Sequence, residues 1–168
     1  DGSFTFSLPG PLTSLAETSA AGGADPAVED LAVGESCTLV ARVSLREGTS
    51  RVTLAVDLSA ADGALAIESA TVTRVGAAVT LVGGGGVAPA AVVSDAAWPG
   101  DALDDRAVFD FGVAVNAGDN AADAGDELEV EVVARAVASA GGNAGGAALS
   151  ANASLTLAPG PGPTGLGT

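Results

Sequence analysis

The stretch "DELEVEVVARAVAS", residues 126–139, decides the fold class because its side chains alternate in character at every second position. Each even-numbered residue from 128 to 136 is Leu, Val or Ala, whereas positions 129, 131 and 135 carry charge. Successive side chains of a β-strand point to opposite faces, so this period of two predicts a strand with one buried and one solvated face. Helices covering both faces of such a sheet are not expected.

The same alternation recurs along most of the chain. It predicts further strands at 35–45, 51–58, 64–74, 78–82, 91–93, 106–113 and 147–158. The Gly-containing segment 46–50 is expected to join the first two of these as a hairpin. In the last strand the inward positions are predicted to be Leu149, Ala151, Ala153, Leu155 and Leu157. About seven to nine short strands separated by Gly, Asp, Asn and Pro predict an all-β, Ig-like antiparallel β-sandwich.

Length and composition favour one domain with a core of small side chains. The 168 residues are 48% apolar but only 3% aromatic, so Val, Leu, Ile and Ala must fill the interior. We place the sandwich at 14–158, an N-terminal segment that is either linker or edge strand at 1–13, and a Pro/Gly linker at 159–168. Edge strands at 14–19, or around Phe4 and Phe6, are candidates for pairing with a neighbouring copy.

The charge balance excludes several classes of partner. Twenty-one Asp and Glu face six Arg, and the formal net charge is −15. Nucleic acid and anionic lipid are therefore not expected as partners, since neither is attracted without a basic patch. No apolar run long enough to span a bilayer occurs, so membrane insertion is not expected either. A surface this acidic favours salty extracellular surroundings.

The chain carries few groups that could perform catalysis. His, Lys and Tyr are absent, which leaves carboxylates and hydroxyls for general-base and nucleophilic chemistry. The single cysteine, Cys37, alternates with apolar neighbours and is predicted to be a small buried hydrophobe. The glycine run at 83–86 lacks the Lys of a phosphate-binding loop and is interpreted as a turn. We predict that the protein is not an enzyme.

The loop "NAGDNAADAGD" (116–126) is crowded with carboxylates and is the main candidate for a ligand site. Ca²⁺ takes about six to eight oxygen ligands, often from carboxylates spaced along a turn. Candidate ligands are Asp119, Asn120, Asp123, Asp126 and Glu127. One interpretation is therefore an irregular Ca²⁺ site, which Asp101, Asp104 and Asp105 of the preceding loop would extend.

A second interpretation of this loop needs no ligand. An EF-hand beginning at Asp119 would place Ala124 at its required glycine and Val130 at its bidentate glutamate, so that motif does not fit. Asp, Asn and Gly collect in tight turns for conformational reasons. Acidic residues at a strand end also discourage pairing with neighbours. On this view the loop is a solvated turn, and no cofactor is required.

One modification motif is present. Asn152, Ala153 and Ser154 form an N-glycosylation sequon in which Asn152 is expected to face outward. The motif lies within a predicted strand, whereas acceptor asparagines usually lie on loops. A glycan at Asn152 and an unmodified sheet-surface asparagine therefore both remain as interpretations.

Three stretches resemble one known family. They are "LAVGESCTLVARVSLREGTSRVTLAVDL" (31–58), "AVFDFGVAVNAGDNAADAGDELEVEVVARAV" (107–137) and "NAGGAALSANASLTL" (143–157). In this order they resemble the DUF11-like, isopeptide-type adhesin repeat. The resemblance implies an Ig-like sandwich repeated in tandem along long cell-surface proteins. Some relatives carry a Lys–Asn or Lys–Asp isopeptide bond, and this chain has no Lys to form one.

Two functional hypotheses follow from these observations. The first is a non-catalytic structural or spacer module of a long extracellular or cell-surface protein of adhesin or filament type. Its partners would be neighbouring repeats or copies of the same chain. The second is a Ca²⁺-dependent recognition or adhesion module that binds a glycan or a protein through its acidic loops.

Overall fold

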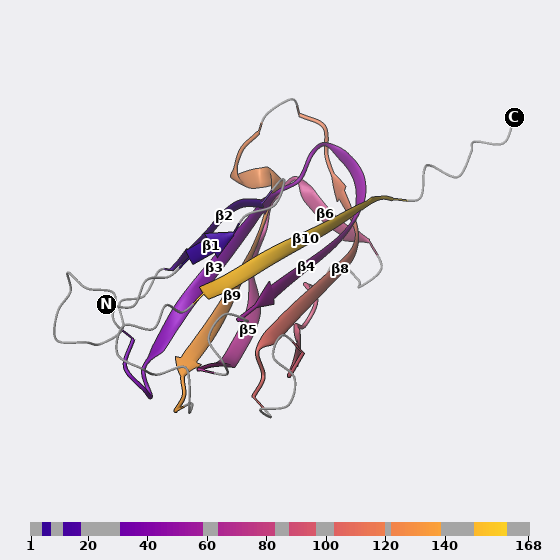
Figure 1. Cartoon of the computed structure of the whole chain (residues 1–168). Helices are drawn as coiled ribbons and strands as arrows, with labels where there is room; N and C mark the ends of the chain where they lie inside the picture. The colour runs from indigo at the N-terminus through magenta and orange to yellow at the C-terminus, as the bar shows by residue number, and fades with distance from the viewer. Residues whose placement is uncertain are drawn as a thin grey trace, which may run out of the picture.

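Two β-sheets packed face to face make up the structure (Figure 1). The computed structural model of the chain describes residues 5–7, 12–17, 31–58, 64–82, 88–96, 103–119, 122–138 and 150–160. These residues form the strands β1 (Thr5–Ser7), β2 (Leu12–Glu17), β3 (Ser36–Ser44), β4 (Gly48–Asp57), β5 (Leu65–Val75), β6 (Val79–Val82), β7 (Val92–Ser94), β8 (Arg106–Asn116), β9 (Glu127–Ala136) and β10 (Ser150–Pro159), with one 3-10 helix, η1 (Ala124–Asp126). None of the residues described lies in a helix long and apolar enough to cross a membrane.

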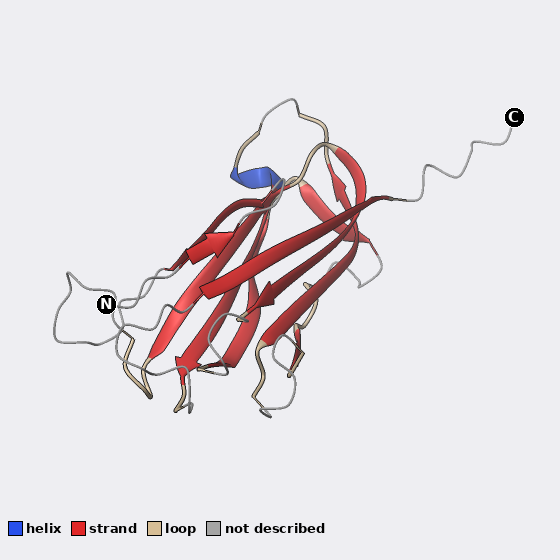
Figure 2. Ribbon diagram, in the orientation of Figure 1, coloured by secondary structure: helices blue, strands red, loops and turns tan. Residues whose placement is uncertain are grey.

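The strand order confirms the predicted all-β antiparallel sandwich (Figure 2). One sheet has the order β1-β10-β4-β8-β6, with β7 also paired to β8, and the other has the order β2-β3-β9-β5. Every strand pair is antiparallel except β1 with β10. In constant-type immunoglobulin domains the last strand ends its sheet, whereas here β10 lies between β1 and β4.

The predicted hairpin at 46–50 is wrong. β3 pairs with β2 and β9, whereas β4 pairs with β10 and β8, so the two strands lie in opposite sheets. The three residues between Ser44 and Gly48 therefore cross from one sheet to the other. Gly48 has φ of 112°, a left-handed conformation that glycine adopts without strain. Hydrophobic alternation identified both strands but carries no information about which sheet each one joins.

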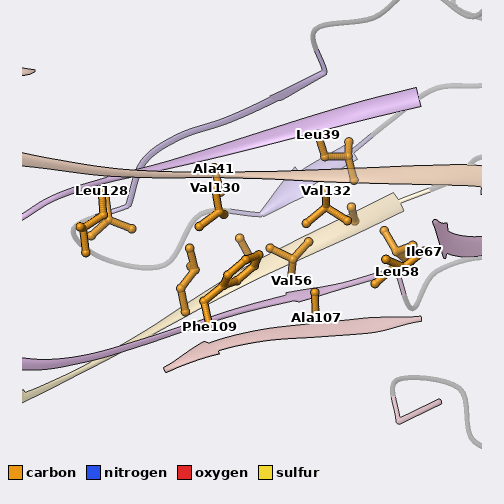
Figure 3. Packing of buried hydrophobic residues seen from close by; sticks show 14 of the residues in the cluster. Leu39, Ala41, Val56, Leu58, Ile67, Ala107, Phe109, Leu128, Val130 and Val132 are labelled. Atoms are coloured by element: carbon orange, nitrogen blue, oxygen red, sulfur yellow. The ribbon is translucent and has the colours of Figure 1, made fainter. Parts of the chain in front are cut away.

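The core lies between the two sheets and consists mainly of small apolar side chains. Leu39, Ala41, Leu128, Val130 and Val132 of one sheet face the inner side chains of the other, which include Phe109, Val56 and Ala107 (Figure 3). All five predicted inward positions of β9 are buried, as are Cys37 and its alternate neighbours on β3. The predicted burial of Cys37 is therefore confirmed. Phe109 is the largest fully buried side chain among the residues that the structure describes.

A β-bulge changes the phase of β8. Val52 of β4 is opposite Gly112, and Thr53 is opposite Asp110, so Phe111 is the extra residue. Gly112, next to the extra residue, adopts φ of 65°, a left-handed conformation that glycine tolerates. Phe109 and Phe111 are buried before the bulge, and Ala114 and Asn116 are buried after it. Inward positions are therefore odd-numbered before Gly112 and even-numbered after it.

The inner row of β10 becomes more exposed toward the end of the strand. Ala151 and Ala153 are buried as predicted, and Leu155 is partly buried against the core. Leu157, predicted to face inward and opposite the fully buried Val52, is 40% exposed. The predicted position Leu149 lies outside the described residues. Burial of the inner row of β10 thus decreases from Ala151 to Leu157.

The first and last described strands lie near the two predicted boundaries of the sandwich, which stay predictions. β1 lies within the segment 1–13 and pairs with β10 as an edge strand, which is one of the two alternatives for that segment. β2 begins at Leu12, two residues before the predicted start of the sandwich. β10 continues to Pro159, and the Gly160 amide donates a hydrogen bond to Thr49 O. The rest of the predicted linker, 161–168, lies outside the described residues.

We expect Phe109→Ala to destabilise the fold strongly. Phe109 is 0% exposed and packs against small side chains that cannot refill its volume. Truncation of a buried Phe costs about 3–5 kcal/mol, which urea unfolding with linear extrapolation would measure. Val82→Ala, on the half-exposed β6, is the control and should change stability by no more than about 0.5 kcal/mol. Equal stability of the two variants would contradict the packing described.

Candidate functional site

The acidic loop enters β9 through a capped 3-10 turn. Asp123 is the N-cap of η1, and its Oδ1 accepts a hydrogen bond from the Gly125 amide at 2.6 Å. Asp126 returns the interaction, because its Oδ2 accepts from the Asp123 amide at 3.0 Å. This reciprocal arrangement is a capping box, in which two side chains satisfy backbone donors that the turn leaves free. Two of the predicted calcium ligands therefore have defined structural roles.

Backbone hydrogen bonds fix this turn to the connection between β5 and β6. Gly125 O accepts from the Ala78 amide, and Glu127 O accepts from the Gly76 amide at 2.7 Å. A Cβ atom on Gly76 would lie 2.1 Å from Gly125 O. The close approach of the β5–β6 connection to η1 therefore requires glycine at position 76.

An asparagine side chain links the two sheets at this end of the sandwich. The Leu45 amide donates to Asp126 O, which continues the β3–β9 ladder by one residue. The Leu45 carbonyl instead accepts a 2.9 Å hydrogen bond from Nδ2 of Asn116, at the end of β8 in the other sheet. Asn116 is only 3% exposed. The Asn116 side chain thus supplies the donor for the Leu45 carbonyl in place of a strand backbone, and this hydrogen bond joins the two sheets.

Two buried oxygens at this end have no hydrogen-bond partner among the described residues. They are Oδ1 of Asn116 and Oδ1 of Asp126. Asp126 is 2% exposed, so its carboxylate lies inside the fold. The turn interpretation predicts a solvated carboxylate and is wrong at this residue. A buried polar oxygen without a donor is costly and is normally satisfied by water or an ion.

The other candidate ligands are engaged separately or lie outside the described residues. Glu127 makes an ion pair with Arg74 of β5. The Asp119 amide donates to Glu47 Oε1 at 3.0 Å. Asn120 is outside the described residues. Within the described ranges, no three or more His, Cys, Asp or Glu side chains gather closely enough to hold a metal ion.

The preceding acidic loop lies at the opposite end of the sandwich. Asp104 O accepts from the Ile67 amide, and Asp105 O accepts from the Leu58 amide, just after β4 ends. Asp105 comes directly before β8, and the acidic turn follows the far end of that strand. The 11 residues of β8 separate the two loops by about 35 Å. Asp104 and Asp105 therefore do not extend the 119–127 cluster, and Asp101 lies outside the described residues.

Charged side chains on the outer face of the β2-β3-β9-β5 sheet form cross-strand pairs. Arg42 Nε lies 2.6 Å from Glu129 Oε2, and the two residues are directly opposite each other in the register of β3 and β9. The Thr73 hydroxyl donates to the same carboxylate at 2.9 Å. The hydrogen bond from Arg42, followed by that from Thr73 and the nearby positive charges, lowers the pKa of Glu129 in spite of its partial burial.

Asp57 at the end of β4 has the opposite electrostatic environment. Burial raises the pKa of its carboxyl group, and the nearby Asp105 adds to this effect. Arg106 opposes the shift, with its Nε 3.4 Å from Asp57 Oδ1. Relative to the unfolded chain, the fold therefore raises the pKa of Asp57 and lowers the pKa of Glu129.

The predicted glycosylation site lies inside a sheet. Asn152 of β10 is in register with Asp57 of β4 on one side and with Ser7 of β1 on the other. Its side chain is partly buried, between the buried Ala151 and Ala153, so its outward orientation agrees with the predicted alternation. Glycosylation of Asn152 stays a prediction.

Comparison of the chain with protein-family models, with curated proteins and with solved structures gives no match. The resemblance to adhesin repeats therefore stays a prediction, and the fold rests on the geometry described above.

Sequence reasoning did not identify Asn116 as the side chain that joins the two sheets. Strict alternation from Phe109 and Phe111 would place Val113 and Val115 inward and Asn116 outward. The phase change at Gly112 reverses this. The glycine within an apolar strand was the available signal, because an isolated glycine in a strand often marks a bulge.

We expect Asn116→Ala to destabilise the protein by about 1–3 kcal/mol, because it leaves the Leu45 carbonyl without its donor. Chemical unfolding would measure the change. Thr80→Ala on the exposed side of the adjacent β6 is the control and should have little effect. If Asn116→Ala matched Thr80→Ala, the cross-sheet hydrogen bond would contribute nothing to stability.

The two carboxyl groups with shifted pKa values should affect the acid stability curve in opposite directions. Because the folded-state pKa of Glu129 is lowered, its contribution is present above about pH 4.5 and is lost as the pH falls through the folded value. Glu129→Gln should therefore weaken the protein most at neutral pH and least in acid. Because the folded-state pKa of Asp57 is raised above 3.8, its contribution to stability grows as the pH falls through the raised value.

Urea unfolding of each variant at a series of pH values would measure these differences. The unmodified chain gains stability in acid when Asp57 is protonated, and the Asp57→Asn variant lacks this gain. The stability of the variant relative to the unmodified chain should therefore be highest at neutral pH. A Glu129→Gln difference that stayed constant with pH would contradict the Arg42 interaction.

Proposed function

We propose that the chain is a non-catalytic structural module that sets distance in a long extracellular or cell-surface assembly of adhesin or filament type. The observation that carries the proposal is the parallel pairing of β1 with β10. Thr5 begins β1 beside Ser150, and β10 continues nine residues further to Pro159. At about 3.3 Å per residue, the chain enters one end of the sheet and leaves about 30 Å away at the other.

This direction of the chain suits an element of a tandem array. Each module placed between two neighbours adds its own long dimension to the reach of the assembly, and it needs no binding pocket to do so. The inner faces are filled by small apolar side chains, and no described core residue is suited to nucleophilic or acid–base chemistry except Cys37, which is buried without a histidine. Neighbouring repeats or copies of the same chain are the proposed partners.

The distribution of charge supports an extracellular setting. Five of the six arginines, namely Arg42, Arg51, Arg74, Arg106 and Arg135, make ion pairs on the outer faces of the sheets. The net charge of −15 therefore leaves an excess of carboxylates, several of which lie in the loops at both ends. Self-repulsion among them is screened at high ionic strength, which favours salty surroundings.

One observation favours the second candidate, a Ca²⁺-dependent recognition module for a glycan or protein. Asp126 is buried with Oδ1 unpartnered by any described residue, and the exposed Asp123 and Asp119 belong to the same loop. A cation bound at this end would satisfy the buried oxygen and bring these carboxylates together. The capping roles of Asp123 and Asp126 favour the spacer proposal, because both side chains already accept hydrogen bonds from backbone amides of the turn.

Thermal unfolding in Ca²⁺ and in EGTA separates the two functions. A ligand bound only by the folded state adds RT ln(1 + [L]/Kd) to stability, which is about 2.7 kcal/mol at a hundredfold excess over Kd. For a domain of this size that corresponds to a midpoint shift of several degrees. The spacer proposal predicts the same midpoint in both solutions, even at millimolar Ca²⁺.

Two variants make this measurement specific to the loop. A Ca²⁺-dependent shift that disappears in Asp126→Asn but persists in Asp110→Asn, whose carboxylate is exposed on β8, would establish the recognition module and overturn the spacer proposal. A shift retained in both variants would place the ion elsewhere and would also count against a passive spacer.

A further inference from the structure

Most edges of the two sheets have features that prevent pairing with another chain. β5 is interrupted by two register shifts and carries Glu68 and Arg74. β2 contains a register shift between Leu12 and Ser14 and ends at Glu17. β6 and β7 have only four and three residues. Bulges, charge and short length are the usual means by which sheet edges avoid association.

The second half of β10 has none of these three features, and only Pro159 at its last position limits pairing. β1 covers only residues 150–152, so positions 153–159 have β4 on one side and no strand on the other within the described part of the chain. β10 pairs with β4 without a register shift. Its ten residues, "SANASLTLAP", contain no charged side chain although the protein carries a net charge of −15. Two copies can therefore bring this edge together without placing like charges opposite each other on the strand.

The inner face of this edge is also incompletely covered. Leu54 and Val52 of β4 are fully buried, whereas Leu155 and Leu157, their register partners on β10, are partly buried and 40% exposed. Burial is lost only on the side where no further strand lies among the described residues. An added strand would remove these leucines from water and would pair with the backbone groups that β10 presents on that side.

We propose that the edge of β10 at 153–159 is a self-association surface that pairs antiparallel with the same edge of a second copy. The segment is centred on Thr156, so a two-fold axis there places Thr156 opposite Thr156 of the second copy. Leu155 then lies opposite Leu157, and Ser154 lies opposite Ala158. The even spacing keeps both leucines on the inner face and both Ser154 and Ala158 on the outer face.

A second copy satisfies this edge because the surface is complementary to itself. A two-fold interface uses the same patch on both partners, and here each leucine meets a leucine and the threonines meet each other, which are favourable cross-strand pairs. This surface goes beyond the spacer proposal, since a spacer needs only end-to-end connections. It assigns a lateral contact between copies.

Cysteine cross-linking of the full chain tests the register directly. In a Cys37→Ala background, Thr156→Cys would place two thiols on directly opposed positions, where Cα separations of about 4.5–5.5 Å allow a disulfide. Mild oxidation should then give a covalent dimer. Ser154→Cys is the matched control on the same face, because the two thiols introduced at position 154 would be about 13 Å apart and could not be bridged. Adding Ala158→Cys to Ser154→Cys should restore the cross-link.

A second measurement does not depend on disulfide formation. The mass of the unmodified chain in solution, followed by light scattering, should rise toward that of a dimer as concentration increases. Leu157→Lys should keep the protein monomeric by placing a charge on the apolar side of the edge. Val92→Lys, on the exposed β7 at the opposite edge, should dimerise like the unmodified chain.

The proposal is overturned if Thr156→Cys cross-links no better than Ser154→Cys, or if the chain stays monomeric at every concentration. Either result would leave the spacer proposal intact, provided that the protein unfolds cooperatively and its midpoint does not respond to Ca²⁺. A Ca²⁺-dependent midpoint together with the predicted cross-links would overturn the spacer proposal and support the β10 surface. The two proposals therefore fail separately.

Discussion

The packing of two rows of small apolar side chains between the sheets is the constraint on which the other features depend. β3 and β9 contribute unbroken inner rows of Leu, Val, Ala and Cys, and the opposite sheet supplies Val52, Leu54, Val56 and the bulky Phe109. Sheets packed in this way lie about 10 Å apart, and the space between them is filled by the side chains themselves. Polar groups are therefore confined to the outer faces and to the two ends, where Asp105, Asn116 and Asp126 are the buried exceptions among the described residues. Any ligand chemistry must be found at the ends or on the surfaces.

Alternation in the sequence predicted the class of fold and most inner positions, since a period of two directly records which side of a strand faces the core. It could not predict how strands are partnered, because β3 and β4 have the same pattern whether they form a hairpin or belong to opposite sheets. It also failed after Gly112, where one extra residue reverses the phase and brings Asn116 into the core. The 40% exposure of Leu157 depends on what lies beside β10 in its sheet, which the alternation within β10 does not record. For the acidic loop, composition identified the turn, but the capping box and the Arg74–Glu127 pair depend on three-dimensional contacts.

The few arginines are placed where strands run side by side. Arg42 and Arg74 lie close to Glu129 and Glu127 across β9, and Arg106 lies opposite Asp57, so repulsion between adjacent carboxylates on the sheets is reduced. These pairs are partly exposed and contribute modestly to stability. Their larger effect is on where negative charge remains. The loops at both ends keep carboxylates such as Asp119, Asp123 and Asp104, whereas β10 has no charge at all. Neighbouring modules should therefore repel each other end to end and meet most easily along β10.

The direction of the chain limits which copies can meet along β10. Because the chain enters at one end of the sheet and leaves at the other, consecutive modules of a tandem array follow one another along the array. Antiparallel pairing at Thr156 requires two modules that lie side by side and point in opposite directions. Consecutive modules could satisfy this only if the connection between them folded back over the full length of a module, about 30 Å. If both proposals hold, the β10 contact would join separate arrays that run antiparallel, whereas the covalent connection would set distance along each array. Length and lateral association would then be controlled by different parts of the same small sandwich, and a charge introduced at Leu157 would remove the second without altering the first.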